Sequence, residues 1–170
     1  MKKIHTLIFF IFMTGTLFAK THTYYYNREW GRANPENAVY YREISDTRNF
    51  RGYAYTDFFM NGRPKSSGYM KKFNNKNTIN GPVIIYDFDG KTAEKSSYLS
   101  GKKHGKEIKY YRNGAIRSIT GYKNGMKHGK EIKYFENETI SYEANYKNDL
   151  LHGTETFYKF NGDIITKIEY

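Results

Sequence analysis

Hydrophobic and polar residues alternate along much of the chain after residue 50, with the period of two that is typical of half-buried β-strands. In three successive segments an isoleucine stands two positions before a tyrosine, as in Ile84, Ile108 and Ile132. The 3.6-residue period of an amphipathic helix is absent from this pattern. The alternation therefore predicts an all-β protein.

The alternation recurs every 24 residues, with a glycine at the start of each unit and tyrosines five and seventeen residues later. These repeat positions are Gly81, Gly105, Gly129 and Gly153, Tyr86, Tyr110, Tyr134 and Tyr158, and Tyr98, Tyr122, Tyr146 and Tyr170. A less regular unit, which contains Phe58 and Asn61-Gly62, precedes them. A fixed period of this length indicates an array of one supersecondary unit.

Each unit has the pattern of a β-hairpin. We predict three-residue turns with a bulge, such as Arg112-Asn113-Gly114 with the glycine in the left-handed conformation, and expect them to keep the isoleucines and both tyrosine columns on one apolar face. The opposite face then carries charges such as Glu107 and Lys109, which we expect to point to water. The same expectation covers the equivalent Glu131, Lys133 and Glu155. The predicted fold is a single-layer antiparallel β-meander of about five hairpins, with about ten strands.

The first nineteen residues have a different character. Met1-Lys2-Lys3 is a basic start, an apolar run follows from residue 4 to 12, and Ala19 suits a cleavage site. This pattern predicts a helical signal peptide at 1–19 and export to the periplasm, the envelope or the medium; the alternative is an uncleaved membrane anchor. Residues 20–50 do not follow the period and are predicted to form an irregular N-terminal cap, and residues 51–170 the repeat domain.

The composition excludes some chemistry and favours an anionic partner. The 170 residues include no cysteine, which rules out disulfides, thiol nucleophiles and thiolate metal sites, and 18 tyrosines. The net charge is +11, and between residues 101 and 134 ten basic residues stand against two acidic ones. This basic block is Lys102, Lys103, Lys106, Lys109, Arg112, Arg117, Lys123, Lys127, Lys130 and Lys133. It indicates contact with anionic lipid, polysaccharide or acidic protein; solvated Glu–Lys pairs are the alternative, and export argues against nucleic acid.

Histidines precede three of the repeat glycines, at His104, His128 and His152. Equivalent residues on successive hairpins lie two strands apart, about 9–10 Å, which is too far for one metal ion. We therefore expect them to pack at the turns and predict no metal and no cofactor. The tyrosines are expected to form the core, with an exposed stacking platform as the alternative. No catalytic motif is present, so an enzyme is not predicted.

The segment Tyr122-Lys123-Asn124-Gly125-Met126-Lys127-His128-Gly129, followed by Lys130-Glu131-Ile132-Lys133-Tyr134, resembles the MORN repeat. The spacing is most similar to that of bacterial MORN-variant proteins labelled YwqK-like antitoxin components, over about residues 50–170. The resemblance implies a β-hairpin sheet for protein–protein contact, with membrane association in some eukaryotic members, and no catalytic residue. Glu138 and Asp149 depart from the glycines of the other turns.

Three hypotheses follow from the sequence. The first is an exported, non-enzymatic repeat protein that binds an unknown protein as an interaction or scaffold module of the cell envelope. The second is a membrane-surface or anionic-glycan binder acting through residues 101–134. The third is a small hydrolase with a site built from residues 20–50, and the resemblance adds a toxin-neutralising role.

Overall fold

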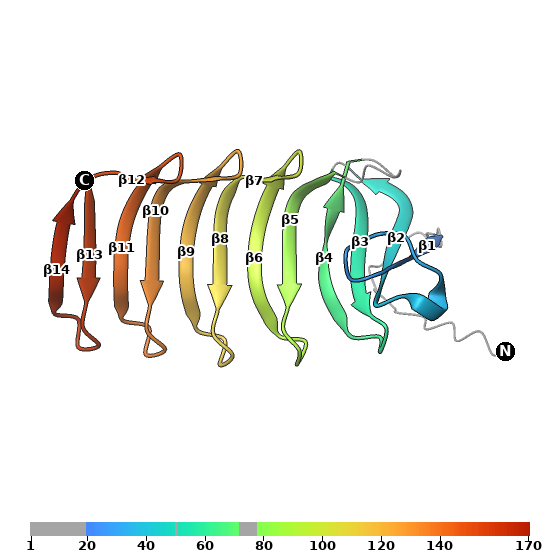
Figure 1. Ribbon diagram of the computed structural model, residues 1–170, viewed down its shortest axis with the longest axis horizontal. Coiled ribbons are helices and arrows are strands. Elements are labelled where there is room, and N and C mark those ends of the chain that lie inside the picture. The colour runs from blue at the N-terminus through green and yellow to red at the C-terminus, as the bar shows by residue number, and fades with distance from the viewer. Residues whose placement is uncertain (1–19, 50, 72–77) are drawn as a thin grey trace, which may run out of the picture.

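The computed structural model describes residues 20–49, 51–71 and 78–170, which form one open antiparallel β-sheet (Figure 1). Each strand on the main path pairs with the next along the chain, so the predicted all-β meander is confirmed. The strands are β1 Thr21–Tyr26, β2 Tyr40–Asn49, β3 Gly52–Phe59, β4 Pro64–Met70, β5 Ile79–Tyr86, β6 Thr92–Leu99, β7 Lys102–Lys103, β8 Gly105–Tyr110, β9 Ile116–Lys123, β10 Met126–Tyr134, β11 Ile140–Lys147, β12 Leu150–Leu151, β13 Thr154–Tyr158 and β14 Ile164–Glu169.

Helical structure in the described ranges is limited to one 3₁₀ turn, η1 Pro35–Asn37. Within these ranges no helix is long and apolar enough to cross a membrane. The signal helix predicted for residues 1–19 lies outside the described residues.

The segment predicted as an irregular cap contributes two strands to the sheet. β1 pairs with β2, where Tyr26 lies opposite Tyr40. β2 in turn pairs with β3, where Arg42 lies opposite Asp57. The tyrosine-rich ends of this segment have high β propensity although they do not follow the 24-residue period. The irregular part is therefore confined to the connection between β1 and β2.

The turns at one border of the sheet, which lie within the repeat units, have the three-residue loop predicted from the sequence. The backbone N–H of Tyr111 donates to the carbonyl of Ala115 over 2.8 Å and encloses residues 112–114. Gly114 has a φ of 93°, which an L side chain rarely adopts. The prediction of a left-handed glycine in this turn is confirmed.

A β-bulge immediately after this turn changes the faces of the sheet. Tyr110 pairs with Ile116, but Lys109 pairs with Ser118, so Arg117 is an extra residue in β9. An extra residue reverses which side chains of the strand point to which face. Tyr122 consequently lies on the face of Glu107, not on the face of Tyr110.

We name the two faces by their side chains. The isoleucine face carries Ile108 and Tyr110, and the ladder face carries Glu107 and Tyr122. The expectation that both tyrosine columns share one face is wrong, because the bulge recurs in every unit.

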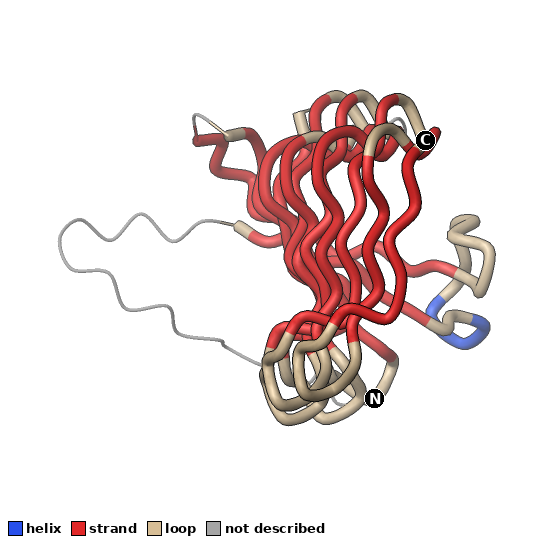
Figure 2. Tube along the Cα trace, turned by 90° about the vertical axis from the view of Figure 1, so that its left-hand side faces the viewer, coloured by secondary structure: helices blue, strands red, loops and turns tan. Residues whose placement is uncertain are grey.

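The expectation that the glutamates face water is also wrong. Glu107 is 3% exposed, Glu131 5% and Glu155 8%. The strands are bowed (Figure 2), and neighbouring ladder-face side chains shield these carboxylates, although no second layer covers the sheet in the part described. The tyrosine columns are mostly half-buried, and the largest fully buried apolar side chains are Ile44 and Met70.

The connection between β1 and β2 packs on the ladder face. The Trp30 ring stacks on Tyr40 with centroids 5.2 Å apart and an interplanar angle of 17°, and it lies 5.4 Å from the Tyr26 ring. The guanidinium of Arg42 lies 5.4 Å from the Trp30 centroid, and the ammonium of Lys65 lies 5.0 Å from it. Alternating aromatic and cationic groups thus close this end of the sheet.

Candidate binding surfaces

The repeat glycines bring a lysine and a glutamate of the same strand region together. Gly105 has a φ of 96°, and the Nζ atom of Lys103 lies 3.0 Å from a carboxylate oxygen of Glu107. In a straight strand, side chains four residues apart are separated by about 13 Å. The next unit repeats the arrangement, with Lys127 and Glu131 2.9 Å apart. Only glycine adopts this positive φ readily, which explains why a glycine recurs every 24 residues.

The other two units have different residues at the positions of the lysine and the glutamate. At Gly153 the lysine is replaced by Leu151, and Glu155 instead accepts hydrogen bonds from the hydroxyls of Tyr142 (2.7 Å) and Tyr170 (3.0 Å). At Gly81 both charges are absent from the equivalent positions, which hold Ile79 and Val83. Each buried carboxylate of the column therefore has a partner of its own.

These ion pairs keep their charges. Burial acts to raise the pKa of Glu131, but the hydrogen bond and charge of Lys127 outweigh it and leave the pKa below its usual range. Burial likewise acts to lower the pKa of Lys103, and its hydrogen bonds to Glu107 and Glu94 outweigh that effect and raise it. Glu131 and Lys103 are therefore charged at neutral pH.

A hollow of about 420 Å³ opens on the ladder face between β8 and β11. Lys109, Arg117 and Lys133 line it together with tyrosine rings. Arg117 and Lys133 form no ion pair within the described ranges, and the ammonium of Lys133 lies 4.3 Å from the Tyr142 ring centroid. Lys109 reaches Glu107 at 3.5 Å, but Glu107 already binds a lysine. The hollow therefore has an excess of positive charge.

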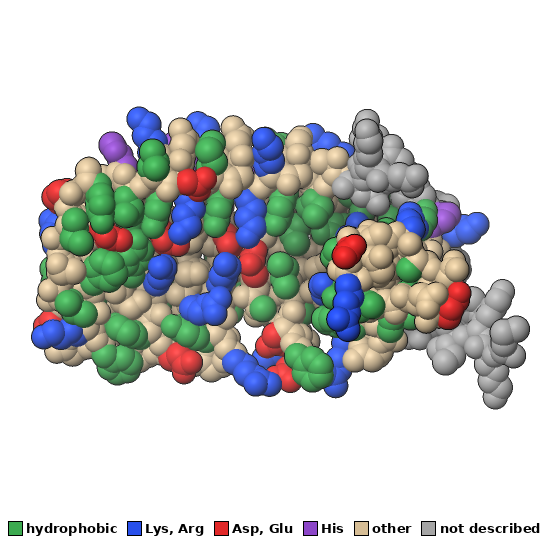
Figure 3. Space-filling model, in the orientation of Figure 1, with side chains coloured by type: hydrophobic (Ala, Val, Ile, Leu, Met, Phe, Trp, Pro, Cys, Tyr) green, Lys and Arg blue, Asp and Glu red, His purple; other side chains and the backbone are tan. Residues whose placement is uncertain are grey.

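The two-residue turns at one border of the sheet pair a lysine with an exposed apolar side chain. Leu99 pairs with Lys102, and the next two turns have the same combination. Leu99 is 49% exposed, Met126 37% and Leu150 73%. The lysine–apolar rim comprises Leu99, Lys102, Lys123, Met126, Lys147 and Leu150. Figure 3 shows basic and hydrophobic side chains side by side along this upper border.

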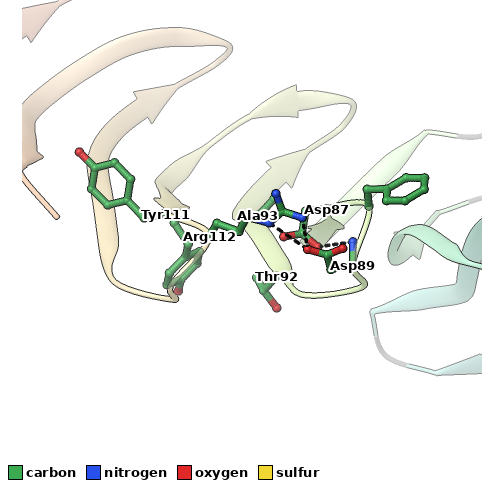
Figure 4. Close-up of a pocket in the computed structure, with 8 residues that line it drawn as sticks. Asp87, Asp89, Thr92, Ala93, Tyr111 and Arg112 are labelled. Atoms are coloured by element: carbon green, nitrogen blue, oxygen red, sulfur yellow. Dashed lines mark hydrogen bonds and ion pairs between the residues drawn. The ribbon is translucent and has the colours of Figure 1, made fainter.

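The opposite border holds a second hollow, of about 310 Å³, between neighbouring three-residue turns (Figure 4). Arg112 reaches across to Asp89 of the preceding turn, and its Nε lies 2.9 Å from the carboxylate. This hydrogen bond is the main cause of the lowered pKa of Asp89. The carboxylate of Asp87 accepts the backbone N–H groups of Asp89 and Lys91. Asp87 thus stabilises its own turn, and Asp89 links two neighbouring turns.

The basic block does not form one patch. Lys103, Lys109, Lys127 and Lys133 lie on the ladder face, Lys106 and Lys130 on the isoleucine face, Lys102 and Lys123 on the rim, Arg117 at the bulge and Arg112 at the far turns. Lys147 completes the rim although it lies outside the block. Each pair occupies the positions six and three residues before a repeat glycine, with the apolar residue first in Leu99–Lys102 and the lysine first in the other two pairs. This spacing was the signal that could have identified the rim.

The histidines lie next to the repeat glycines. The backbone N–H of His104 donates to Ser97 over 2.8 Å, and that of His152 to Asn145 over 2.9 Å. The Nδ1 atoms of His104 and His128 are buried without a hydrogen-bond partner. Across the described ranges, no three histidine, aspartate or glutamate side chains gather closely enough to hold a metal ion.

Two hairpins match a known family model. Residues 103–124 and 127–148 match the model described as MORN repeat variant. These two segments are MORN-type repeats. They cover the hairpins β8–β9 and β10–β11, which carry both Lys–Glu pairs and most of the first hollow. A comparison with curated proteins gives no match.

Proposed function

We propose that this protein is a non-catalytic binding module that attaches to anionic phospholipid headgroups through the lysine–apolar rim. The observation that carries the proposal is the threefold pairing of lysine with an exposed leucine or methionine along one border. MORN-type repeats generally bind proteins or membranes, which supports a binding role.

The chemistry of the rim fits the boundary between headgroups and acyl chains. A lysine near an anionic membrane contributes about 1 kcal/mol, and the attraction declines with salt. An apolar side chain that leaves water contributes roughly 1.5–3 kcal/mol when fully buried. Successive turns lie two strands apart, about 9–10 Å, so three pairs form a line about 20 Å long. A flat membrane can meet such a line, whereas it cannot meet lysines on both faces of the sheet at once.

Vesicle flotation tests the proposal. Wild-type protein is expected to float with vesicles containing anionic phospholipid, to stay behind with neutral vesicles, and to release at about 0.5 M salt. The triple variant K102E/K123E/K147E should lose at least tenfold in affinity. The matched control K109E/R117E/K133E changes the charge equally in the hollow and should still float.

Two results would overturn the proposal. One is a wild-type protein that does not float with anionic vesicles even at low salt. The other is an equal loss in both triple variants, which would assign binding to net charge alone. The variant L99S/M126S/L150S should weaken binding without changing its salt dependence, because it removes only the apolar contribution.

A second candidate function is supported by the hollow on the ladder face. Its cations Lys109, Arg117 and Lys133 exceed the nearby acids and lie beside tyrosine rings. This chemistry suits an acidic segment of a partner protein. Binding of an oligo-glutamate peptide, followed by fluorescence anisotropy, should fail in K109E/R117E/K133E and persist in the rim variant. The opposite ranking would rule out the hollow.

The cell envelope is the proposed location. The basic start, the apolar run and Ala19 support export, and a mature N-terminus at Lys20 in the mass spectrum of the cellular protein would test it. The toxin-neutralising role implied by the YwqK-like resemblance is a third candidate. Co-expression with a toxin encoded beside it would have to restore growth.

A further inference from the structure

The last strand of the sheet exposes all of its residues. In β14, Ile164 is 58% exposed, Ile165 61% and Ile168 40%. On its outer side, β14 has no neighbouring strand in the described chain. Lys167 and Glu169 flank Ile168, and both side chains lie on the isoleucine face.

Along β14 the backbone N–H and C=O groups of successive residues point alternately toward β13 and toward the open edge of the sheet. Gly153 and Tyr170 exchange two backbone hydrogen bonds, of 3.1 and 2.9 Å. In an antiparallel ladder such pairs alternate, so Ile168 also turns its N–H and C=O toward β13. Lys167 and Glu169 therefore direct their N–H and C=O groups outward, where a further strand can bind.

We propose that two copies of this chain associate by antiparallel pairing of β14 with β14, with Ile168 opposite Ile168 of the second copy. In this register Lys167 lies opposite Glu169 of the second copy, and Glu169 opposite Lys167. These two pairs exchange four backbone hydrogen bonds through the outward groups. Cross-strand pairs of opposite charge stabilise a sheet, so the edge is complementary to itself.

Other registers and partners lack this complementarity. A two-fold axis at residue 167 places lysine opposite lysine, and one at residue 169 places glutamate opposite glutamate. A lysine on an edge strand normally prevents pairing with another edge strand. In β14, however, Glu169 provides a charge that matches Lys167 of the second copy. The other edge strand, β1, contains no acidic or lysine side chain to match β14. The pairing of β14 with itself also closes after two copies.

Charge reversal tests the pairing in solution. Sedimentation equilibrium from about 1 µM to about 1 mM should show a monomer–dimer equilibrium. K167E and E169K should each weaken the dimer at least tenfold, because each places like charges opposite one another. The double variant K167E/E169K exchanges the charges and should restore it. Far-UV circular dichroism checks that each variant keeps the sheet.

The absence of cysteine allows a geometric test. Residues that face each other without exchanging backbone hydrogen bonds have Cα atoms about 4.5 Å apart, within the range of a disulfide. The variant I168C should form a disulfide-linked dimer on oxidation. The control T166C should not, since the two copies of residue 166 are separated by four positions, about 14 Å at roughly 3.4 Å per residue.

Each outcome decides the proposal. Restoration by the double exchange together with selective linkage of I168C supports it. A protein that is monomeric throughout, a dimer indifferent to both single reversals, or faster linkage of T166C than of I168C overturns it.

Discussion

The Nζ atom of Lys127 and the Oε1 atom of Glu131 lie 2.9 Å apart although the two residues stand four positions apart along β10. The positive φ of Gly129 bends the strand between them, and the ladder register shifts at this point. The apolar pair Ile79 and Val83 occupies the equivalent positions around Gly81. Around Gly81 both positions are therefore apolar, whereas around Gly153 only the lysine is replaced and Glu155 accepts hydrogen bonds from two tyrosines instead.

The first prediction concerns this coupling. K127I leaves the buried carboxylate of Glu131 without its cation and should lower the free energy of unfolding by about 2 kcal/mol. K127I/E131V copies the combination of Ile79 and Val83, and it should recover most of that loss. Urea unfolding followed by circular dichroism measures both variants. A double variant no more stable than K127I would contradict the prediction.

The second prediction concerns pH. The pKa of Glu131 is lowered, since Lys127 outweighs the effect of burial, so its contribution to stability is complete above the ordinary value of 4.5 and is lost as the pH falls through the lower pKa of the folded state. The pKa of Lys127 is raised: burial acts to lower it, and the hydrogen bond to Glu131 prevails. Its contribution is complete below 10.5 and is lost as the pH rises through the higher folded pKa.

Urea midpoints across the pH range test this window. Wild-type protein should lose stability between roughly pH 5 and pH 2, and K127I should show a smaller change over that interval. K109A is a suitable control, because Lys109 lies on the same face and leaves the Lys127–Glu131 pair intact. If K127I and wild type keep the same difference in stability at every pH, the pair does not produce the effect.

The period, the hairpins and the three-residue turns were predictable because glycine, tyrosine and alternation mark them directly. The face on which each side chain of the second strand lies was not predictable, because one bulge residue per unit reverses the alternation. The bulge positions are Lys65, Ala93, Arg117, Ser141 and Ile165. These side chains share neither charge nor size, so backbone geometry alone marks the position. Tyr122 and Glu107 consequently share a face. The residues that line the lysine-rich hollow could therefore not be predicted from their spacing in the sequence.

The third prediction uses a turn that lacks its glycine. Glu138 has a φ of 65°, a left-handed conformation that costs a non-glycine residue roughly 1–2 kcal/mol. Its backbone N–H still donates to Phe135 over 3.0 Å, so the turn keeps the geometry of the others. E138G should raise the free energy of unfolding by about 0.5–1 kcal/mol, after the entropy of glycine in the unfolded chain is subtracted. The reciprocal variant G114E should lower it, and a less stable E138G would show that the turn is not strained.

The last prediction joins the rim to the proposed dimer and rests on both proposals. A two-fold axis normal to the sheet turns the second copy upside down, so the two rims lie on opposite borders of the extended sheet. A dimer should therefore bridge two membranes, and wild-type protein should cluster anionic vesicles at low salt, as measured by dynamic light scattering. K167E should bind vesicles with little clustering, and K167E/E169K should cluster them again. The rim variant K102E/K123E/K147E should neither bind nor cluster, which separates loss of attachment from loss of pairing. Clustering by K167E at the wild-type level would show that bridging does not require β14.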